Sequence, residues 1–282
     1  MQLGDWQLDV VSGGTFRLDG GAMFGVVPKP LWEKKEPADA RNRIRMATHC
    51  LLARDGNVTV LIDTGFGTKG SDRDRENMEL ESGDVLVEGL AQLGVAPDDV
   101  DFVIFSHLHF DHCGGATRFD ARGQVVPVFP RARHVVQARE WRDAMSGAAE
   151  LRSSYDPIHL AALDKADQIM RVEGETQVCP GIRTWLTGGH THGHHMVRID
   201  SRGNTVLYLG DLCPMEPHLR MLWCMAYDVD VLETRRRKPE VLRQAAEENW
   251  VVVFDHDPDL VAGRLERDDK AEFRLVERFA KI

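Results

Sequence analysis

Short apolar runs of strand length recur along this chain, and polar residues able to coordinate a metal ion follow several of them. Asp63, His107, Asp211 and His256 end such runs, and His190 follows another. Because the carboxyl ends of strands can meet at one edge of a sheet, we expect these side chains to converge. Several runs lack polar alternation, which is typical of strands covered on both faces. The runs are residues 58–65, 101–107, 132–138, 181–187, 195–200, 205–211 and 250–257.

Helical patterns lie between the strand-like runs, and no Gly/Ser/Pro-rich linker divides the 282 residues. Alternating strands and helices favour an α/β fold with sheets sandwiched between helices. We therefore expect one domain over residues 1–282. The last helical pattern carries a proline, which we place in its first turn. The expected helices are residues 83–93, 139–150, 159–170 and 239–249.

The charge and cysteine content exclude several classes of protein. The net charge is −10, with 45 acidic against 35 basic residues, so the surface repels nucleic-acid phosphates. Five cysteines without a CxxC pair indicate a reducing compartment and argue against a thiolate zinc site. The N-terminus lacks the features of a signal peptide, and no apolar run approaches the ~20 residues of a membrane span. We expect a cytoplasmic protein with no membrane or nucleic-acid partner.

The segment "SHLHFDHCGG" carries the strongest chemical signal in the chain. His107 and His109 are two residues apart, so in an extended backbone both rings point to one side and can bind one ion. Asp111 and His112 follow where the chain turns, and they can reach a second ion. Imidazole and carboxylate without thiolate suit zinc, manganese, iron or cobalt. The competing interpretation is a histidine-rich surface loop with Asp111 as a helix cap, but the preceding strand and following glycines favour a metal site.

These residues resemble the H-x-H-x-D-H motif of the metallo-β-lactamase superfamily. "LTGGHTHGHH" is similar to that family's T-P-G-H-T-x-G-H segment and supplies His190. "LYLGDL" resembles the strand that ends in a bridging aspartate, Asp211, and "VVVFDHDP" supplies His256. "VLIDTG" resembles the family's early strand and ends at Asp63. The resemblance covers residues 47–258 as the core and implies a four-layer αβ/βα sandwich, with residues 1–46 as an N-terminal extension containing a pocket or interface loop.

The resemblance also implies a ligand set for two divalent metal ions, with zinc first and iron, cobalt or manganese as alternatives. Two such ions roughly 3.5–4 Å apart hold a hydroxide whose parent water has a pKa of about 7. Asp111 would orient this nucleophile as the catalytic carboxylate, and Asp63 would support a ligand from behind. The implied set is His107, His109 and His190 for one ion, Asp111, His112 and His256 for the other, and Asp211 between them.

Other histidines compete for one position of this set. His192, His194 and His195 follow His190 closely and could each replace it as a ligand. We favour His190 because it occupies the position that the family motif gives to the ligand.

The members of the superfamily differ in substrate, and this sequence resembles the group of N-acyl homoserine lactonases and methyl-parathion-hydrolase-like enzymes. Only 26 residues follow His256, which argues against a glutathione-binding thioesterase, and the chain has no room for an RNA-processing or flavin-binding domain. Two apolar stretches could form a substrate pocket for an acyl chain or the interface of a homodimer. Their residues are Met23, Phe24 and Trp32 in one stretch and Met221, Leu222 and Trp223 in the other.

The leading hypothesis is a dinuclear hydrolase that opens acyl-homoserine lactones, an activity known as quorum quenching. An arylesterase or phosphotriesterase with the same centre is the near alternative, and an iron-dependent sulfur dioxygenase or a thioesterase is the further one. One departure from the lactonases stands out. Their tyrosine three residues after the bridging aspartate is replaced here by Pro214.

Overall fold

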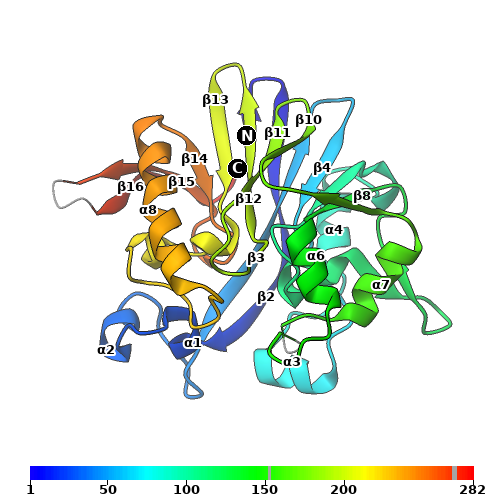
Figure 1. The fold of residues 1–282 in the computed structure, drawn as a ribbon, viewed down its shortest axis with the longest axis horizontal. Helices are drawn as coiled ribbons and strands as arrows, with labels where there is room; N and C mark the ends of the chain where they lie inside the picture. The colour runs from blue at the N-terminus through cyan, green and yellow to red at the C-terminus, as the bar shows by residue number, and fades with distance from the viewer. Residues whose placement is uncertain (152–153, 269–271) are drawn as a thin grey trace.

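The computed structural model describes residues 1–151, 154–268 and 272–282, which fold around two facing sheets of seven strands each (Figure 1). The strand order of the first sheet is β1-β2-β3-β4-β5-β8-β9, and that of the second is β10-β11-β12-β13-β14-β15-β16. The strands of the first sheet are β1 (Gln2–Leu3), β2 (Trp6–Asp19), β3 (Arg43–Arg54), β4 (Thr59–Ile62), β5 (Phe102–Ile104), β8 (Arg133–Gln137) and β9 (Ile169–Val172). Those of the second are β10 (Thr176–Cys179), β11 (Ile182–Leu186), β12 (His195–Ser201), β13 (Asn204–Tyr208), β14 (Val251–Val253), β15 (Ala262–Arg267) and β16 (Phe273–Phe279).

Helices cover the outer face of each sheet. On the first sheet lie α4 (Val85–Gln92), α6 (Ala138–Met145) and α7 (Pro157–Lys165), and on the second lies α8 (Val231–Glu247) (Figure 1). The remaining elements are the short helices α1 (Gly20–Phe24), α2 (Lys29–Trp32), α3 (Asp72–Met78) and α5 (Phe110–Cys113), and a small sheet of β6 (Thr117–Phe119) and β7 (Val125–Pro127).

Separate apolar clusters hold the layers together. One cluster fills the space between the two sheets and joins side chains such as Ile62 and Ile104 to Val206 and Val253. A second cluster lies between the first sheet and its helices, and a third lies between the second sheet and α8. Strands buried on both faces explain the unbroken apolar runs in the sequence. The expected four-layer αβ/βα sandwich is confirmed.

Each of the seven expected strand runs contains an observed strand, but three expected helices have different bounds. The helix expected over residues 139–150 is α6, which ends at Met145. The helix expected over residues 159–170 ends at Lys165, and residues 169–172 form β9 instead. The helix expected to begin at Pro239 begins at Val231, where the side chain of Asp230 accepts a hydrogen bond from the Glu233 amide. Pro239 therefore lies inside α8, where ion pairs from Glu233 to Arg236 and Arg237 support the preceding turn.

The N-terminal segment is part of the first sheet. Strands β2 and β3 pair over most of their length, with a register shift between Ser12 and Thr15. None of the helices within the described ranges combines the length and apolar character needed to cross a membrane.

Candidate metal centre

The candidate ligands come from loops at the carboxyl ends of parallel strands. Strands β4, β5 and β8 run parallel in the first sheet, as do β13 and β14 in the second. The His107–His112 loop follows β5, whereas Asp211 and His256 follow β13 and β14. His190 lies between β11 and β12. Because the inner faces of the two sheets pack together, both sets of loops reach the same edge of the sandwich.

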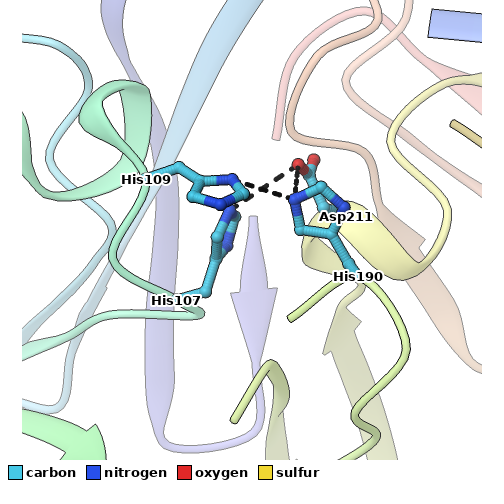
Figure 2. A group of neighbouring side chains, drawn as sticks. All are labelled: His107, His109, His190 and Asp211. Carbon is cyan, nitrogen blue, oxygen red and sulfur yellow. Dashed lines mark hydrogen bonds and ion pairs between the residues drawn. The ribbon is translucent and has the colours of Figure 1, made fainter. Parts of the chain in front are cut away.

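The first group of candidate ligands is His107, His109, His190 and Asp211, whose ligand atoms all lie within 4.8 Å of one another (Figure 2). His190 Nε2 lies 3.0 Å from both His109 Nδ1 and Asp211 Oδ2. His107 is fully buried, and its Nε2 lies 3.7 Å from Asp211 Oδ2 without a hydrogen bond among the described residues. Such an orphaned nitrogen, beside three further donors, is the environment that a metal ion needs.

A second group lies beside the first and shares Asp211 with it. Its members are His112, Asp211, Asp255 and His256. His112 Nε2 and His256 Nε2 are 3.1 Å apart, and His256 Nε2 lies 3.2 Å from Asp211 Oδ1. Asp211 therefore directs one oxygen to each group, which is the arrangement that a bridging carboxylate requires.

Asp111 borders the second group from the cavity side. Its carboxylate oxygens lie 3.6 Å from His256 Nε2 and 3.9 Å from His112 Nε2. The residue that caps the short helix α5 is His109, and the Asp111 side chain makes no capping hydrogen bond. The carboxylate is therefore not committed to a structural role as a helix cap.

The hydrogen bonds around the rings test whether the site suits a cation. Nδ1 of His112 lies 2.8 Å from the Asp63 carboxylate, and Nδ1 of His256 lies 2.7 Å from the Ala47 carbonyl oxygen. Both Nδ1 atoms must donate, so in the neutral rings both Nε2 atoms carry lone pairs. Two lone pairs facing each other at 3.1 Å repel unless a positive charge lies with them. The donor set therefore fits a metal ion.

The pKa shifts of His190 and His112 also show that the carboxylates of the site favour positive charge. Burial lowers the pKa of His190, but the charge of Asp211 and its hydrogen bond outweigh burial and raise the pKa to about 10. Burial likewise opposes the charged form of His112, whose pKa the surrounding carboxylates raise to about 9. His107 lies deepest, and burial holds its pKa well below the ordinary value. The centre thus combines anionic oxygens with a nitrogen that resists protonation.

Asp63 supports His112 from behind. Its carboxylate accepts hydrogen bonds from the amide and hydroxyl of Ser106 at 2.7 Å and from the Tyr208 hydroxyl at 3.0 Å. The Asp63 backbone is left-handed, with φ of 56°. These bonds fix the carboxylate that in turn orients the His112 ring.

Two further carboxylates hold the site, and the sequence offered no pattern for either. Asp228 contacts His190 Nδ1 at 3.0 Å, and its side chain is 1% exposed. Glu140, on α6, is fully buried and accepts hydrogen bonds from the Leu108 amide and the Thr191 hydroxyl. Glu140 therefore joins the loop of His107 and His109 to the loop of His190. Contacts across more than 30 residues leave no periodic signal that could have revealed them.

A close approach of backbones accounts for both glycines of the motif, since a Cβ atom at Gly114 would lie 2.4 Å from the carbonyl oxygen of Phe66. A Cβ atom at Gly115 would lie 2.0 Å from the carbonyl oxygen of Thr64. The amide of Thr64 donates to the carbonyl of His112 at 2.7 Å, so the same contact anchors the end of α5. A side chain at Gly115 would push the motif away from the Asp63 loop.

The neighbouring histidines lie outside both groups. His192 is half-exposed and pairs with Asp143 at 2.9 Å. His194 is buried behind His107 and contacts the Thr187 hydroxyl through Nδ1 at 2.6 Å. His195 is buried at the start of β12. Of the four candidates, only His190 has a ring nitrogen in a group of ligand atoms.

A cavity of about 470 Å³ opens onto the centre and is lined by Asp111, His190, Asp211 and His256 among others. Met23 lies on its wall, and so does Met225, from the same apolar stretch as Met221. Further apolar lining residues lie outside both stretches: Met46, Phe66, Phe110, Leu160 and Leu163. The other five expected pocket residues are not among the lining residues. Phe24, Trp32 and Trp223 are buried in the apolar cluster that includes Met23, and Met221 and Leu222 are about half exposed.

Comparison with known proteins agrees with this geometry. The family model described as the metallo-beta-lactamase superfamily matches residues 43–256. The solved structure of a probable metal-dependent hydrolase from Staphylococcus aureus is 31% identical, with a TM-score of 0.90 over 99% of this chain and 98% of its own. An N-acyl homoserine lactonase from Bacillus thuringiensis is 26% identical over 229 residues, which are 76% of this chain and 82% of the relative.

A further solved structure, AidC, is a dizinc quorum-quenching lactonase in complex with a product. It shares the fold with a TM-score of 0.79 at 20% identity, over 98% of this chain and 96% of its own. The family match spans most of the chain and includes both groups of candidate ligands. The chain therefore belongs to the metallo-beta-lactamase superfamily, as its motifs predicted.

Proposed function

We propose that this protein is a dinuclear metal-dependent hydrolase that opens acyl-homoserine lactones. The observation that carries the proposal is the pair of donor groups joined by Asp211 at the end of a cavity with apolar walls. The similarity to N-acyl homoserine lactonases over 76% of the chain supports this substrate class.

The first ion would be held by His107, His109 and His190, and the second by His112, His256 and Asp111, with Asp211 between them. Three imidazoles and one carboxylate suit zinc at the first site. A bound pair of divalent ions supplies Lewis acidity, polarising a carbonyl oxygen and lowering the pKa of water to about 7.

Asp111 is the group of this chain that moves a proton. Its carboxylate lies on the cavity wall beside His256 and is free of capping bonds. It accepts a proton from the attacking water as the water oxygen bonds to the lactone carbonyl carbon. When the ring C–O bond breaks, Asp111 returns that proton to the departing alkoxide, so the product is the ring-opened hydroxy acid.

Tyr227 places a hydroxyl in the same cavity. We assign to it the role of the lactonase tyrosine that Pro214 replaces in this chain. The side chain lines the cavity and is 44% exposed, and its hydroxyl makes no hydrogen bond with the described residues. Burial raises the pKa of Tyr227, and the charges of Asp19 and Asp111 add to the shift. A protonated phenol beside the reacting carboxylate can donate to the substrate carbonyl oxygen.

The size and lining of the cavity fit an acyl chain. A volume of about 470 Å³ lies within the range of small-molecule pockets, roughly 300–1,000 Å³. Its apolar lining from Met46, Phe66, Leu160 and Met225 can exclude water from a hydrocarbon tail. Aryl esters and phosphotriesters would use the same centre, so the assay must compare these substrates directly.

The test is a substrate panel on metal-loaded protein. The panel contains N-acyl homoserine lactones of different chain lengths, an aryl ester, a phosphotriester, a thioester and a sulfur substrate under oxygen. We expect the highest kcat/KM for a lactone, with release of one acid per ring opened. Activity confined to the sulfur substrate, with about one metal per chain, would refute the hydrolase. A higher kcat/KM for the aryl ester or phosphotriester would refute the lactonase assignment.

A variant of Asp111 tests the mechanism separately from the substrate. Asp111→Asn keeps the size of the side chain but removes the proton acceptor, so kcat should fall by about 100-fold or more. Asp143→Asn is the matched control, because Asp143 pairs with His192 outside the centre. Full activity of Asp111→Asn would remove Asp111 from the proposed role.

A further inference from the structure

Asp255 immediately precedes His256 and has no role in the function proposed above. Its side chain is 1% exposed, and neither carboxylate oxygen has a hydrogen-bond partner among the described residues. One of its oxygens belongs to the second group of candidate ligand atoms, with His112, Asp211 and His256. Its Oδ2 lies 3.9 Å from His256 Nε2.

The backbone on either side of this carboxylate is fixed. The amide of His49 donates to the carbonyl of Asp255 at 2.8 Å, and the amide of Ala47 donates to the carbonyl of His256 at 3.1 Å. Strand β3 therefore holds both residues. The carboxylate is directed into the centre by a rigid segment and not by a mobile loop.

Two other buried carboxylates near Asp255, those of Asp63 and Asp257, are satisfied by protein donors. Asp63 accepts bonds from Ser106 and Tyr208, and Asp257 accepts bonds from the amides of Glu216 and Asp259. An ionised carboxylate without such partners is strongly destabilised in a protein interior. A metal ion beside His112 and His256 would give the Asp255 carboxylate the partner that the described residues do not provide as hydrogen-bond donors.

We propose that Asp255 is an additional ligand of the second metal ion and that this site prefers Mn²⁺ or Fe²⁺ over Zn²⁺. The inference rests on the dinuclear centre proposed above. With Asp255 and Asp111, the second site offers two imidazoles and three carboxylates. Zinc sites are usually four-coordinate, whereas manganese and iron(II) accept five or six ligands and favour carboxylate oxygen. The first site, with three imidazoles, retains the preference for zinc.

The test measures metal binding and not turnover. Metal-free wild-type protein and the Asp255→Asn variant are titrated with Mn²⁺ and with Zn²⁺, and stoichiometry and Kd are determined by calorimetry and elemental analysis. Wild type should bind two ions per chain, with Mn²⁺ preferred at one site. Asp255→Asn should lose at least 10-fold in Mn²⁺ affinity at that site and keep zinc affinity at the other. Asp257→Asn, on the same segment, is the control and should bind like wild type.

Unchanged binding of both ions by a folded Asp255→Asn variant would overturn the proposal, and so would a preference for zinc at both wild-type sites. If the variant does not fold, the absorption spectrum of wild-type protein loaded with two Co²⁺ ions decides. Weak d–d bands from one five- or six-coordinate site support the proposal, and two strongly absorbing tetrahedral sites contradict it. Because lactone turnover enters none of these measurements, an inactive but metal-binding protein would refute only the proposed function.

Discussion

At the scale of single residues, the site depends on what lies behind each histidine ring. Three histidine rings have their Nδ1 bonded to a protein oxygen, which leaves the Nε2 of each ring facing the centre. The oxygens belong to Asp63, Asp228 and the Ala47 carbonyl. A carboxylate partner also makes the ring a better electron donor. The candidate ligands are thus oriented before any ion binds.

Tyr227 gives the first prediction. The Tyr227→Phe variant should lower kcat on a lactone by about 100-fold, because a donor to the developing oxyanion is lost. KM and the melting temperature should change little, since the hydroxyl makes no bond with the described residues. Steady-state kinetics measure the effect, with Val229→Ala as an exposed control nearby. A Tyr227→Phe enzyme with full kcat would show that another group polarises the carbonyl.

Local sequence spacing explains which residues could be predicted. The motif from His107 to His112 is contiguous, so its chemistry is visible without knowing the fold. Asp228 touches His190 only because the chain returns after 38 residues, and nothing in its own neighbours signals that contact. Asp255 lies in the "VVVFDHDP" segment, yet only the structure shows that its carboxylate oxygens have no hydrogen-bond partner among the described residues.

At the scale of elements, helix α6 connects the two ligand loops through one side chain. Glu140 accepts bonds from the Leu108 amide, the Tyr155 hydroxyl, the Thr191 hydroxyl and the Gly193 amide. Burial raises the pKa of Glu140, and these hydrogen bonds counteract the shift. The helix thereby positions both loops as well as covering the sheet.

The Glu140→Gln variant tests this connection. The glutamine side chain keeps one accepting oxygen, but its Nε2 cannot accept, so the donors now bonded to one of the two Glu140 oxygens lose their acceptor inside the protein. We expect a loss of about 2–3 kcal/mol in the free energy of unfolding, measured by urea denaturation of metal-free protein. Glu247→Gln, at an exposed position of α8, should change it by less than about 0.5 kcal/mol. Equal stabilities for the two variants would contradict the role given to Glu140.

Strand β8 gives a pH-dependent prediction through His134. Burial lowers the pKa of this ring from 6.5 to about 3, and the ring stacks on Phe105 with centroids 5.5 Å apart. Between these values the unfolded chain binds a proton that the folded protein excludes, so stability falls as the pH decreases. The contribution is about 1.4 kcal/mol per pH unit.

His134→Phe should therefore unfold with a shallower loss of stability between pH 6 and pH 4 than wild type. Denaturant titrations at several pH values measure the slopes. His192→Gln is the control, because His192 is half-exposed, and it should retain the wild-type slope. Parallel curves for His134→Phe and wild type would show that this ring does not control acid stability.

The limits of prediction at this scale also have physical causes. The long β2 strand was not among the expected runs, because the register shift between Ser12 and Thr15 interrupts the alternation that marks a half-buried strand. Helix α8 was expected eight residues too late, because proline is normally found in a first turn. The Asp230 cap and the ion pairs of Glu233 keep the helix intact ahead of Pro239.

At the scale of the whole molecule, the centre lies where the two sheets meet. The loop from His107 to His112 belongs to the first sheet, whereas His190, Asp211 and His256 belong to the second. An ion bound to both halves stabilises only the folded protein. At a free concentration of 1,000 times Kd, one ion adds about 4 kcal/mol to the free energy of unfolding.

Removing metal should therefore lower the melting temperature by about 10 °C, and adding back Zn²⁺ or Mn²⁺ should restore it. Differential scanning calorimetry of chelator-treated and reloaded protein measures the shift. The Asp211→Asn variant should show a smaller response, because its shared carboxylate is gone. A melting temperature independent of metal would mean that ions do not bridge the sheets.

The left-handed backbone of Asp63 limits how this position can change in evolution. A φ of 56° is most readily adopted by glycine, asparagine and aspartate, so most other side chains are disfavoured by conformation. Glycine has no oxygen to offer Ser106, Tyr208 or His112, and asparagine lacks the negative charge. Aspartate alone meets both demands, so we expect almost no amino-acid substitution at this position to keep both the backbone conformation and the support of His112.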